Sequence, residues 1–172
     1  MNAKLNITDI RSWCPCYNPN RYLPEDWKGS VKGILRHRDI PAKDKLWVVL
    51  RNSLLNNKTL RLFAVACARR ALARSKNPDP RYLKACDISE DFANGIATRE
   101  ELVLVATAAT AATHTVTNVA ACAAYAAAPN AWYAAVAAAV TTANSAAYND
   151  DAAAYTAERK WQVNKLLEML GG

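Results

Sequence analysis

Residues that catalysis commonly requires are scarce in this sequence. Of its 172 residues, only five are glycine and two are histidine. The chain has no glycine-rich phosphate loop, no dinucleotide-binding fingerprint and no G-x-S-x-G motif. A nucleophilic thiol or hydroxyl needs a neighbouring base, and two histidines leave few such pairings. We therefore expect that the protein is not an enzyme and has no catalytic residues.

Patterns that bind metals are also rare. The tightest cysteine pair, Cys14 and Cys16, is separated by a single residue, whereas structural zinc sites usually have about two to four. His37 and His114 lie far apart in the sequence, and His114 is interpreted as a small polar packing residue of a helix. We expect no metal and no cofactor. The five cysteines are an odd number, and the chain opens without an apolar run long enough for a signal peptide, so we expect a reducing, cytoplasmic location.

Charge is absent from the longest uniform stretch of the chain. The 48 residues from Leu102 to Asn149 contain no Asp, Glu, Lys or Arg and consist largely of alanine and threonine. Alanine has the highest helix propensity and no period-two alternation occurs, so the stretch is predicted to be helical. Its length would allow a membrane span, but alanine and threonine contribute little transfer free energy. We expect no contact with a membrane.

The formal charge of +7 is concentrated in the first part of the chain. Residues 1–100 contain 19 Lys and Arg against 10 Asp and Glu, whereas residues 101–172 contain 3 against 5. A partner that binds by electrostatic attraction should therefore have an acidic surface and should contact the first part.

The first 23 residues predict an irregular strap. Pro15 and Pro19 lie among asparagines and cysteines, a density of turn formers that a regular helix does not tolerate. Trp13, Tyr17 and Tyr22 are distributed through the same stretch. Aromatic side chains in a loop usually pack against a core or against a partner, and both interpretations remain open for the strap.

The next segments predict four helices. Pro24 suits the first position of a helix that ends near Arg36, and Pro41 precedes a second helix that runs from Ala42 to about Leu55. The run LWVVL within the second could instead form a buried strand, but no other segment offers it a partner. Asn57 suits the cap of a third helix, and the fourth should end at Asn94, before a left-handed glycine at position 95.

The third of these helices separates an apolar stripe from a basic face. Its apolar residues recur at helical spacing and comprise Leu60, Phe63, Ala64, Cys67 and Ala71. Lys58, Arg61 and Arg69 fall on one face away from the stripe, and Arg70 and Arg74 fall on the adjoining face. Such a patch could bind the phosphates of a nucleic acid, and the alternative is an ordinary solvated face.

The uncharged stretch predicts a helical hairpin. Thr98, with Glu101 three residues later, is a capping box from which a long helix should run to Ala128. Pro129 suits the first turn of the next helix, and one of the aspartates at 150–151 should begin a last helix.

Alanine dominates this hairpin, since 25 of the 52 residues between Ala106 and Ala157 are alanine. Aromatic residues recur within it at a seven-residue step, from Tyr125 to Trp132 and from Tyr148 to Tyr155. Close Ala contacts with spaced aromatics predict an antiparallel pair whose seam follows this pattern. Because no charges guard its faces, either the basic half or a second subunit covers it, so homodimerisation through the Ala-rich helices is a hypothesis.

Taken together, these segments predict an all-α fold. We expect a single-domain helical bundle of about six to seven helices, with an Ala-rich helical hairpin and an irregular N-terminal strap. The domain covers 1–172 and comprises the aromatic strap at 1–23, a basic helical half at 24–96 and an Ala-rich helical half at 97–170.

Four segments distributed over nearly the whole chain carry a resemblance to a known family. They read ITDIRSWCPCYNPNRYLPEDW, DKLWVVLRNSLL, TLRLFAVACARRAL and DFANGIATREEL, and an alanine-rich helical tail follows them. In this order they resemble the small bacterial and phage proteins that are described as immunity proteins. The resemblance implies a non-enzymatic helical protein that neutralises a toxin or another effector by binding it. Family tails intersperse Arg and Asp among the alanines, whereas Thr, Asn or Tyr occur here, which favours a packed tail.

The sequence thus supports two functional hypotheses. The first is an immunity-like protein that binds and neutralises or modulates a partner protein with an acidic surface. The alternative is a phage-encoded basic protein that binds DNA, or a host DNA-processing, repair or defence enzyme. The candidate binding residues are the aromatic and basic residues of the first half: Trp13, Tyr17, Arg21, Tyr22, Trp27, Arg36, Arg38, Lys58, Arg61, Arg69, Arg70 and Arg74.

Overall fold

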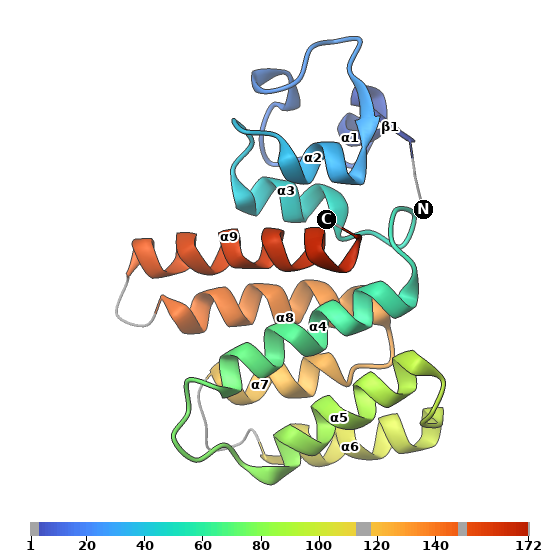
Figure 1. The fold of residues 1–172 in the computed structure, drawn as a ribbon, viewed down its shortest axis with the longest axis vertical. Coiled ribbons are helices and arrows are strands. Elements are labelled where there is room, and N and C mark those ends of the chain that lie inside the picture. Colours follow the sequence, from blue (N-terminus) through green and yellow to red (C-terminus); the bar gives the residue numbers. More distant parts are fainter. Residues whose placement is uncertain (1–3, 113–117, 148–150, 172) are drawn as a thin grey trace.

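A computed structural model describes residues 4–112, 118–147 and 151–171 of the chain. The described residues form a mostly helical single domain with a small two-stranded sheet near the N-terminus (Figure 1). In chain order the elements are β1 (Lys4–Asn6), α1 (Ile7–Ser12), the 3-10 helix η1 (Pro19–Arg21), β2 (Lys28–Ser30), α2 (Val31–Arg36), α3 (Ala42–Val49), α4 (Asn57–Leu72), α5 (Pro80–Asn94), α6 (Arg99–Ala112), α7 (Asn118–Ala126), α8 (Ala131–Ala146) and α9 (Ala152–Met169).

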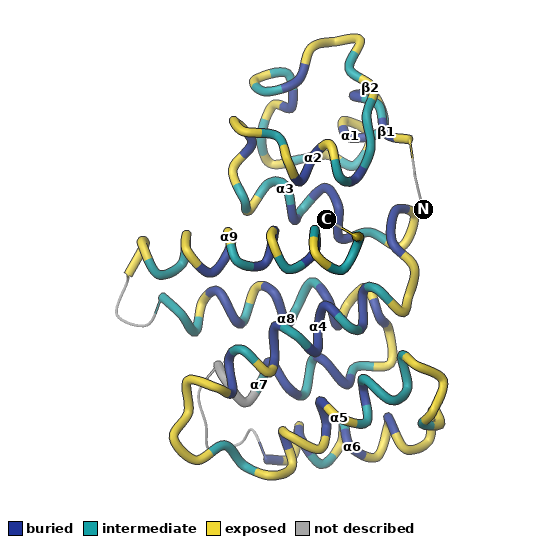
Figure 2. The backbone as a smooth tube through the Cα atoms, viewed as in Figure 1, coloured by how far each residue is buried: buried dark blue, intermediate teal, exposed yellow. Residues whose placement is uncertain are grey.

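The helices form an elongated stack rather than a closed ring. Elements β1 to α2 form an N-terminal unit at the top of Figure 1. Below it, α3 lies on α9, α9 lies on α8, and α8 lies on α4 and α7. Helices α5 and α6 cover the far end of the stack. The buried residues follow the middle of this stack, where α4 and α8 face each other (Figure 2). The predicted all-α single domain is confirmed, although the described residues contain about nine helices rather than six to seven.

Alanine allows α4, α7 and α8 to pack closely. The small residues that face one another from α7 and α8 are completely buried, and those with no exposed surface include Cys122, Ala123, Ala126, Ala134, Ala135, Ala138 and Ala139. Side chains this small let helix axes approach, so backbone and Cβ atoms make the contact. The predicted Ala-rich hairpin is therefore present and consists of α7 and the antiparallel α8 (Figure 1). Helix α9 follows and packs on α8.

The aromatic residues do not form the seam of this hairpin. Trp132 and Tyr133 of α8 are both exposed, and Tyr133 contacts Tyr125 edge-on at the helix surface, with ring centroids 5.8 Å apart. Tyr148 lies outside the described residues. Because small residues fill the contact between the axes, the rings of Trp132 and Tyr133 have no room there and remain exposed. The predicted aromatic seam is therefore wrong for the step from Tyr125 to Trp132.

The helix predicted to run from Thr98 to Ala128 is also wrong. Helix α6 ends at Ala112, and α7 is a separate helix that packs against α6. The positions between them, including His114 and its predicted packing role, lie outside the described residues. Alanine propensity favours a helix at each position, but two shorter helices side by side bury more apolar surface than one long exposed helix.

The N-terminal segment is regular where the sequence predicts a strap. Strand β1 pairs antiparallel with β2, Leu5 opposite Gly29, and α1 follows β1 directly. Asn6 caps α1 in a capping box with Asp9. Residues 28–30 are thus a strand and not part of the helix predicted from Pro24, because their backbone groups pair with a segment more than twenty residues earlier. A local pattern of turn formers does not reveal such a distant partner.

Most predicted helix ends are confirmed within a residue or two, and the exceptions have local causes. Asn56, not Asn57, caps α4, and Asn130 caps α8 after Pro129. Helix α3 stops at Val49, before the predicted end near Leu55, because Leu50 leaves the helical conformation. The LWVVL run lies largely in this helix, as predicted.

Other predicted ends are confirmed directly. Gly95 adopts the left-handed conformation, with φ of 77°, and ends α5. Thr98 and Glu101 form the capping box through reciprocal bonds of 2.8 and 3.2 Å. Asp151 caps α9. None of the helices in the described ranges is both long and apolar enough to cross a membrane.

Candidate functional site

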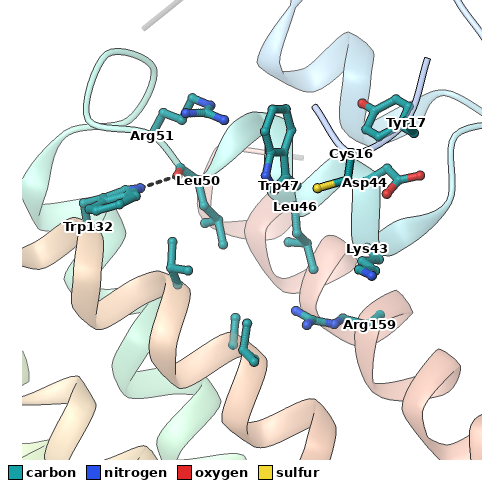
Figure 3. A pocket seen from close by; sticks show the side chains of 13 residues that line it. Cys16, Tyr17, Lys43, Asp44, Leu46, Trp47, Leu50, Arg51, Trp132 and Arg159 are labelled. Atoms are coloured by element: carbon teal, nitrogen blue, oxygen red, sulfur yellow. Dashed lines mark hydrogen bonds between the residues drawn. The ribbon is translucent and has the colours of Figure 1, made fainter. Parts of the chain in front are cut away.

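A pocket of about 320 Å³ opens between α3 and α8, next to the N-terminal segment (Figure 3). Aliphatic side chains of α3 and α8 form its base, while aromatic and charged side chains surround them. The residues that line it are Cys16, Tyr17, Lys43, Asp44, Leu46, Trp47, Leu50, Arg51, Trp132, Val136, Ala139, Val140 and Arg159. It therefore combines side chains from the aromatic N-terminal segment, from the α3 region and from the Ala-rich half.

A guanidinium held between two indoles forms one side of the pocket. The Cζ atom of Arg51 lies 4.3 Å from the ring centroid of Trp13 and 4.4 Å from that of Trp47. Tyr17 meets Trp47 edge-on, with centroids 6.2 Å apart, and also contacts Tyr22. Such stacking fixes the position of an arginine that would otherwise be highly mobile.

The opposite wall comes from α8. Trp132 is 39% exposed, and its Nε1–H donates a hydrogen bond of 2.8 Å to the carbonyl oxygen of Leu50 (Figure 3). That carbonyl lies at the C-terminal end of α3, where helix carbonyls have no partner within the helix. The bond therefore joins α8 to α3 across the pocket and holds the indole at its edge. Val140, 40% exposed, lies two turns further along α8.

Positive charge exceeds negative charge in the pocket lining. Lys43, Arg51 and Arg159 face a single carboxylate, that of Asp44. Arg159 is buried, and its hydrogen bonds go to two neutral groups, the Tyr155 hydroxyl at 3.1 and 3.2 Å and Gln162 Oε1 at 3.2 Å. In the described part of the chain, the buried Nε of Arg51 has no hydrogen-bond partner.

Burial perturbs the acids beside the pocket. Desolvation raises the pKa of Tyr17 to about 12, with a smaller contribution from the Asp44 carboxylate. Desolvation also raises the pKa of Asp44, against the lowering effect of Lys43. A phenol with so high a pKa is neutral at physiological pH, so Tyr17 acts as an apolar wall with a polar tip.

Arg61 occupies the core, although its position in the sequence predicts a basic surface. It is only 2% exposed and donates three hydrogen bonds to backbone carbonyls, at 3.2 Å to Ala126, 2.8 Å to Ala128 and 3.0 Å to Pro129. These carbonyls lie at the C-terminal end of α7, where a cation is favoured. The prediction that Arg61 belongs to a surface patch is wrong, because α7 and α8 fold over this face of α4.

The other arginines of α4 pair within the molecule. Arg69 forms ion pairs with Asp87 and Glu90 of α5. Arg70 and Arg74 both bind Glu158 of α9, whose side chain is 1% exposed, and Arg70 also lies 4.3 Å from the centroid of the Trp161 ring. These three side chains remain partly exposed, but acidic groups compensate their charge. They do not form one continuous patch with Arg61.

The remaining predicted residues lie around the N-terminal unit. Arg21, Arg36 and Arg38 are exposed there, and Lys58 is exposed at the start of α4. Trp27 is half-buried under β2, where a Cβ atom at Gly29 would lie 2.4 Å from the indole. Glycine is therefore required at that strand position for a steric reason.

Of the predicted set, the structure brings Trp13, Tyr17 and Tyr22 together beside the pocket. It brings Arg70 and Arg74 together at Glu158, and it adds residues that sequence reasoning missed. Trp47, Arg51, Trp132 and Arg159 reach the pocket from three separate segments. Trp47 and Trp132 were identifiable only as helix residues, and Arg159 lies beside Lys160 in the last predicted helix. No spacing in the sequence connects them.

The cysteines of the chain differ in exposure and are not clustered with acids in the described residues. Cys14 and Cys16 are exposed, whereas Cys67, Cys86 and Cys122 are buried. Within the described ranges, no three His, Cys, Asp or Glu side chains are grouped in a way that could hold a metal ion.

Comparisons of the chain with protein-family models, with curated proteins and with solved structures find no match. Membership of the immunity-protein family therefore stays a prediction, based on the four sequence segments.

Proposed function

We propose that this protein is a cytoplasmic, non-enzymatic binding protein that neutralises or modulates a partner protein with an acidic surface. The observation that carries the proposal is the solvent-open pocket with aromatic walls and uncompensated guanidinium groups. Aromatic and arginine side chains in partly desolvated pockets supply most of the binding free energy in protein interfaces. The resemblance to immunity proteins supports the same class of function.

The distribution of charge supports an acidic partner. Arg21, Arg36, Arg38 and Lys43 are all exposed on the N-terminal unit or at the start of α3. Cations around an aromatic pocket speed the encounter with an acidic surface and disfavour basic partners. The arginines of α4 contribute less to this attraction because carboxylates compensate them.

A pull-down from the native host tests the proposal. The immobilised protein should capture one host protein at both low and moderate salt, with nuclease present. Lys43→Glu, at the pocket, should lose that protein, whereas Lys84→Glu should retain it. The two substitutions are matched, because both lysines are exposed on helices and Lys84 lies on α5 outside the pocket lining. Equal capture by both variants, or no specific capture, would contradict the proposal.

The alternative function, binding to DNA or to a DNA-processing enzyme, predicts a different result. It requires free cations, and Arg36, Arg38 and Lys58 are exposed while the α4 arginines are paired. Phosphate contacts would give a mobility shift with duplex of any sequence, and the shift would disappear between about 50 and 200 mM salt. Arg36→Glu together with Arg38→Glu should weaken it. Arg61→Glu is not a suitable test, because that residue is structural.

Homodimerisation remains a second prediction for the Ala-rich half. The alanines of α7 and α8 already pack within one chain, whereas Val103 and Leu104 on α6 are exposed. Trp132, Tyr133 and Val140 on α8 are exposed as well, so a second copy would pack on the outer faces of α6 or α8. Light scattering at micromolar concentration should give twice the monomer mass, and a monomer mass would exclude the dimer at that concentration.

A further inference from the structure

We infer that the pocket between α3 and α8 binds an aromatic side chain of the partner that is flanked by carboxylates, within a short acidic segment. The inference rests on the proposed function and specifies the chemistry that the partner must present. Pocket size, the nature of its walls and its unbalanced charge each restrict the occupant.

Size limits the occupant to a small group, such as one or two side chains of a short segment. A volume of about 320 Å³ lies at the lower end of the range found for ligand pockets, about 300 to 1,000 Å³. A whole helix laid on the surface would need a long groove, and this cavity lies between Trp47 and Trp132 (Figure 3), with Val140 also in its lining. The base is aliphatic, formed by Leu46, Leu50 and neighbouring residues of α8. A planar apolar side chain fits such a space.

The cations of the pocket lining also require the occupant to supply a hydrogen-bond acceptor. Three cations face one carboxylate, which leaves a formal excess of two positive charges if Asp44 is ionised. The two guanidiniums are held in place, Arg51 by Trp13 and Trp47, and Arg159 by Tyr155 and Gln162. Neither has a carboxylate partner in the described part of the chain. A preorganised arginine favours a carboxylate over a neutral acceptor.

These two requirements together select the occupant. An uncharged apolar side chain would cover the Arg51 guanidinium and leave its charge without an acceptor, which costs free energy. A basic segment would be repelled by the excess positive charge. An aromatic side chain with an acidic residue on either side satisfies both, because its ring fills the aliphatic base while the carboxylates reach Arg51 and the exposed Lys43.

Calorimetric titration with short capped peptides tests the inference without the native partner. The probes are the tripeptides Asp-Phe-Asp, Lys-Phe-Lys and Asp-Ala-Asp, at pH 7 and 50 mM salt. Asp-Phe-Asp should bind at least about tenfold more tightly than either of the others, since one lost charge pair or one lost buried ring is sufficient for that ratio. Comparable affinity of Lys-Phe-Lys, or no measurable binding of Asp-Phe-Asp, would overturn the inference.

A charge-reversal pair at one lining position provides the sharper test. Val140→Glu should weaken Asp-Phe-Asp binding about fivefold, and Val140→Lys should strengthen it, because the two side chains are similar in length and opposite in charge. Lys84→Glu on α5 serves as the control and should leave the affinity unchanged. Circular dichroism establishes that each variant is folded. Equal effects of Val140→Glu and Val140→Lys would mean that charge does not determine binding, and the inference would fail.

A further arm separates a peptide from a free organic acid. If 3-phenylpropionate binds as tightly as Asp-Phe-Asp, the pocket is a small-molecule site and the peptide assignment is wrong. These outcomes are independent of the proposed function. If no host protein is captured, the proposed function is wrong, but the peptide result is unaffected. If the peptides do not bind, this inference is wrong, and a captured partner must bind at another surface.

Discussion

Replacing Arg61 should destabilise the fold far more than replacing any exposed cation. The guanidinium contacts three carbonyl oxygens at the α7–α8 connection, at 2.8 to 3.2 Å. A hydrogen bond to a charged group contributes about 1.5–3 kcal/mol. The three bonds share one guanidinium, and the bonds to Ala128 and Pro129 are partly accessible, so water would replace some of their contribution.

The carbonyl of Ala126 determines the smallest loss of unfolding free energy that we expect for Arg61→Ala. Its bond to Arg61 is buried, and a buried acceptor left without a partner costs about 1–3 kcal/mol. Loss of the contact with Phe92, whose ring centroid lies 5.1 Å from the guanidinium carbon, adds about 0.5–1 kcal/mol. We therefore expect Arg61→Ala to lower the free energy of unfolding by about 2–5 kcal/mol. Arg61→Lys should cost about 2 kcal/mol, since an ammonium cannot reach all three carbonyls in one plane.

Equilibrium urea unfolding followed by circular dichroism measures this effect. Lys58→Ala, an exposed cation on the same helix, is the matched control and should change stability by less than about 0.5 kcal/mol. The urea dependence should remain unchanged, because the variant unfolds the same surface. If Arg61→Ala is within about 1 kcal/mol of the unmodified protein, then the guanidinium does not hold α7 and α8 together and the interpretation of the contact is wrong.

Two further predictions concern buried ionisable groups. Glu158→Gln should lower the free energy of unfolding in urea by about 2–3 kcal/mol. This is below the usual value for a buried ion pair, because both arginine partners are partly exposed. The surface substitution Glu168→Gln on the same helix is the control and should cost less than about 0.5 kcal/mol. Burial raises the pKa of Cys86 to about 12 and of Cys122 to about 11, so both thiols stay protonated in the folded chain while unfolded thiols ionise near pH 9. Under reducing conditions the free energy of unfolding should therefore fall above pH 9, by about 1.4 kcal/mol per thiol per pH unit. Cys86→Ala should make this fall with pH less steep. An unchanged slope in Cys86→Ala would contradict the prediction.

Local signals predicted the helices well because those signals act within a few residues. Gly95 ends α5 because glycine readily adopts the left-handed conformation of a helix C-cap. Thr98 and Glu101 each bond the other's backbone N–H without help from the rest of the chain. The apolar stripe from Leu60 to Ala71 is buried as its spacing predicts. The same reasoning failed at β2, because a strand depends on a partner that can lie anywhere in the sequence.

The candidate site could be predicted only in part. Trp13 and Tyr17 stood out because aromatic residues in a proline-rich segment need a surface to cover. The other half of the pocket comes from Trp47, Trp132 and Arg159, which belong to three helices that meet only after folding. Their sequence separation leaves no periodic signal.

By itself, the sequence determined that this protein is helical, that alanine dominates its second half and that its excess positive charge lies in the first 100 residues. Propensity, capping and charge are properties of residues and their near neighbours. Only the tertiary structure decided which cations remain available, since Arg61 is enclosed by α7 and α8 while Arg51 is held at the edge of an open pocket. Burial and pairing depend on which helices come together, and in this chain alanine is small enough to let α4, α7 and α8 meet without specifying their arrangement in the sequence.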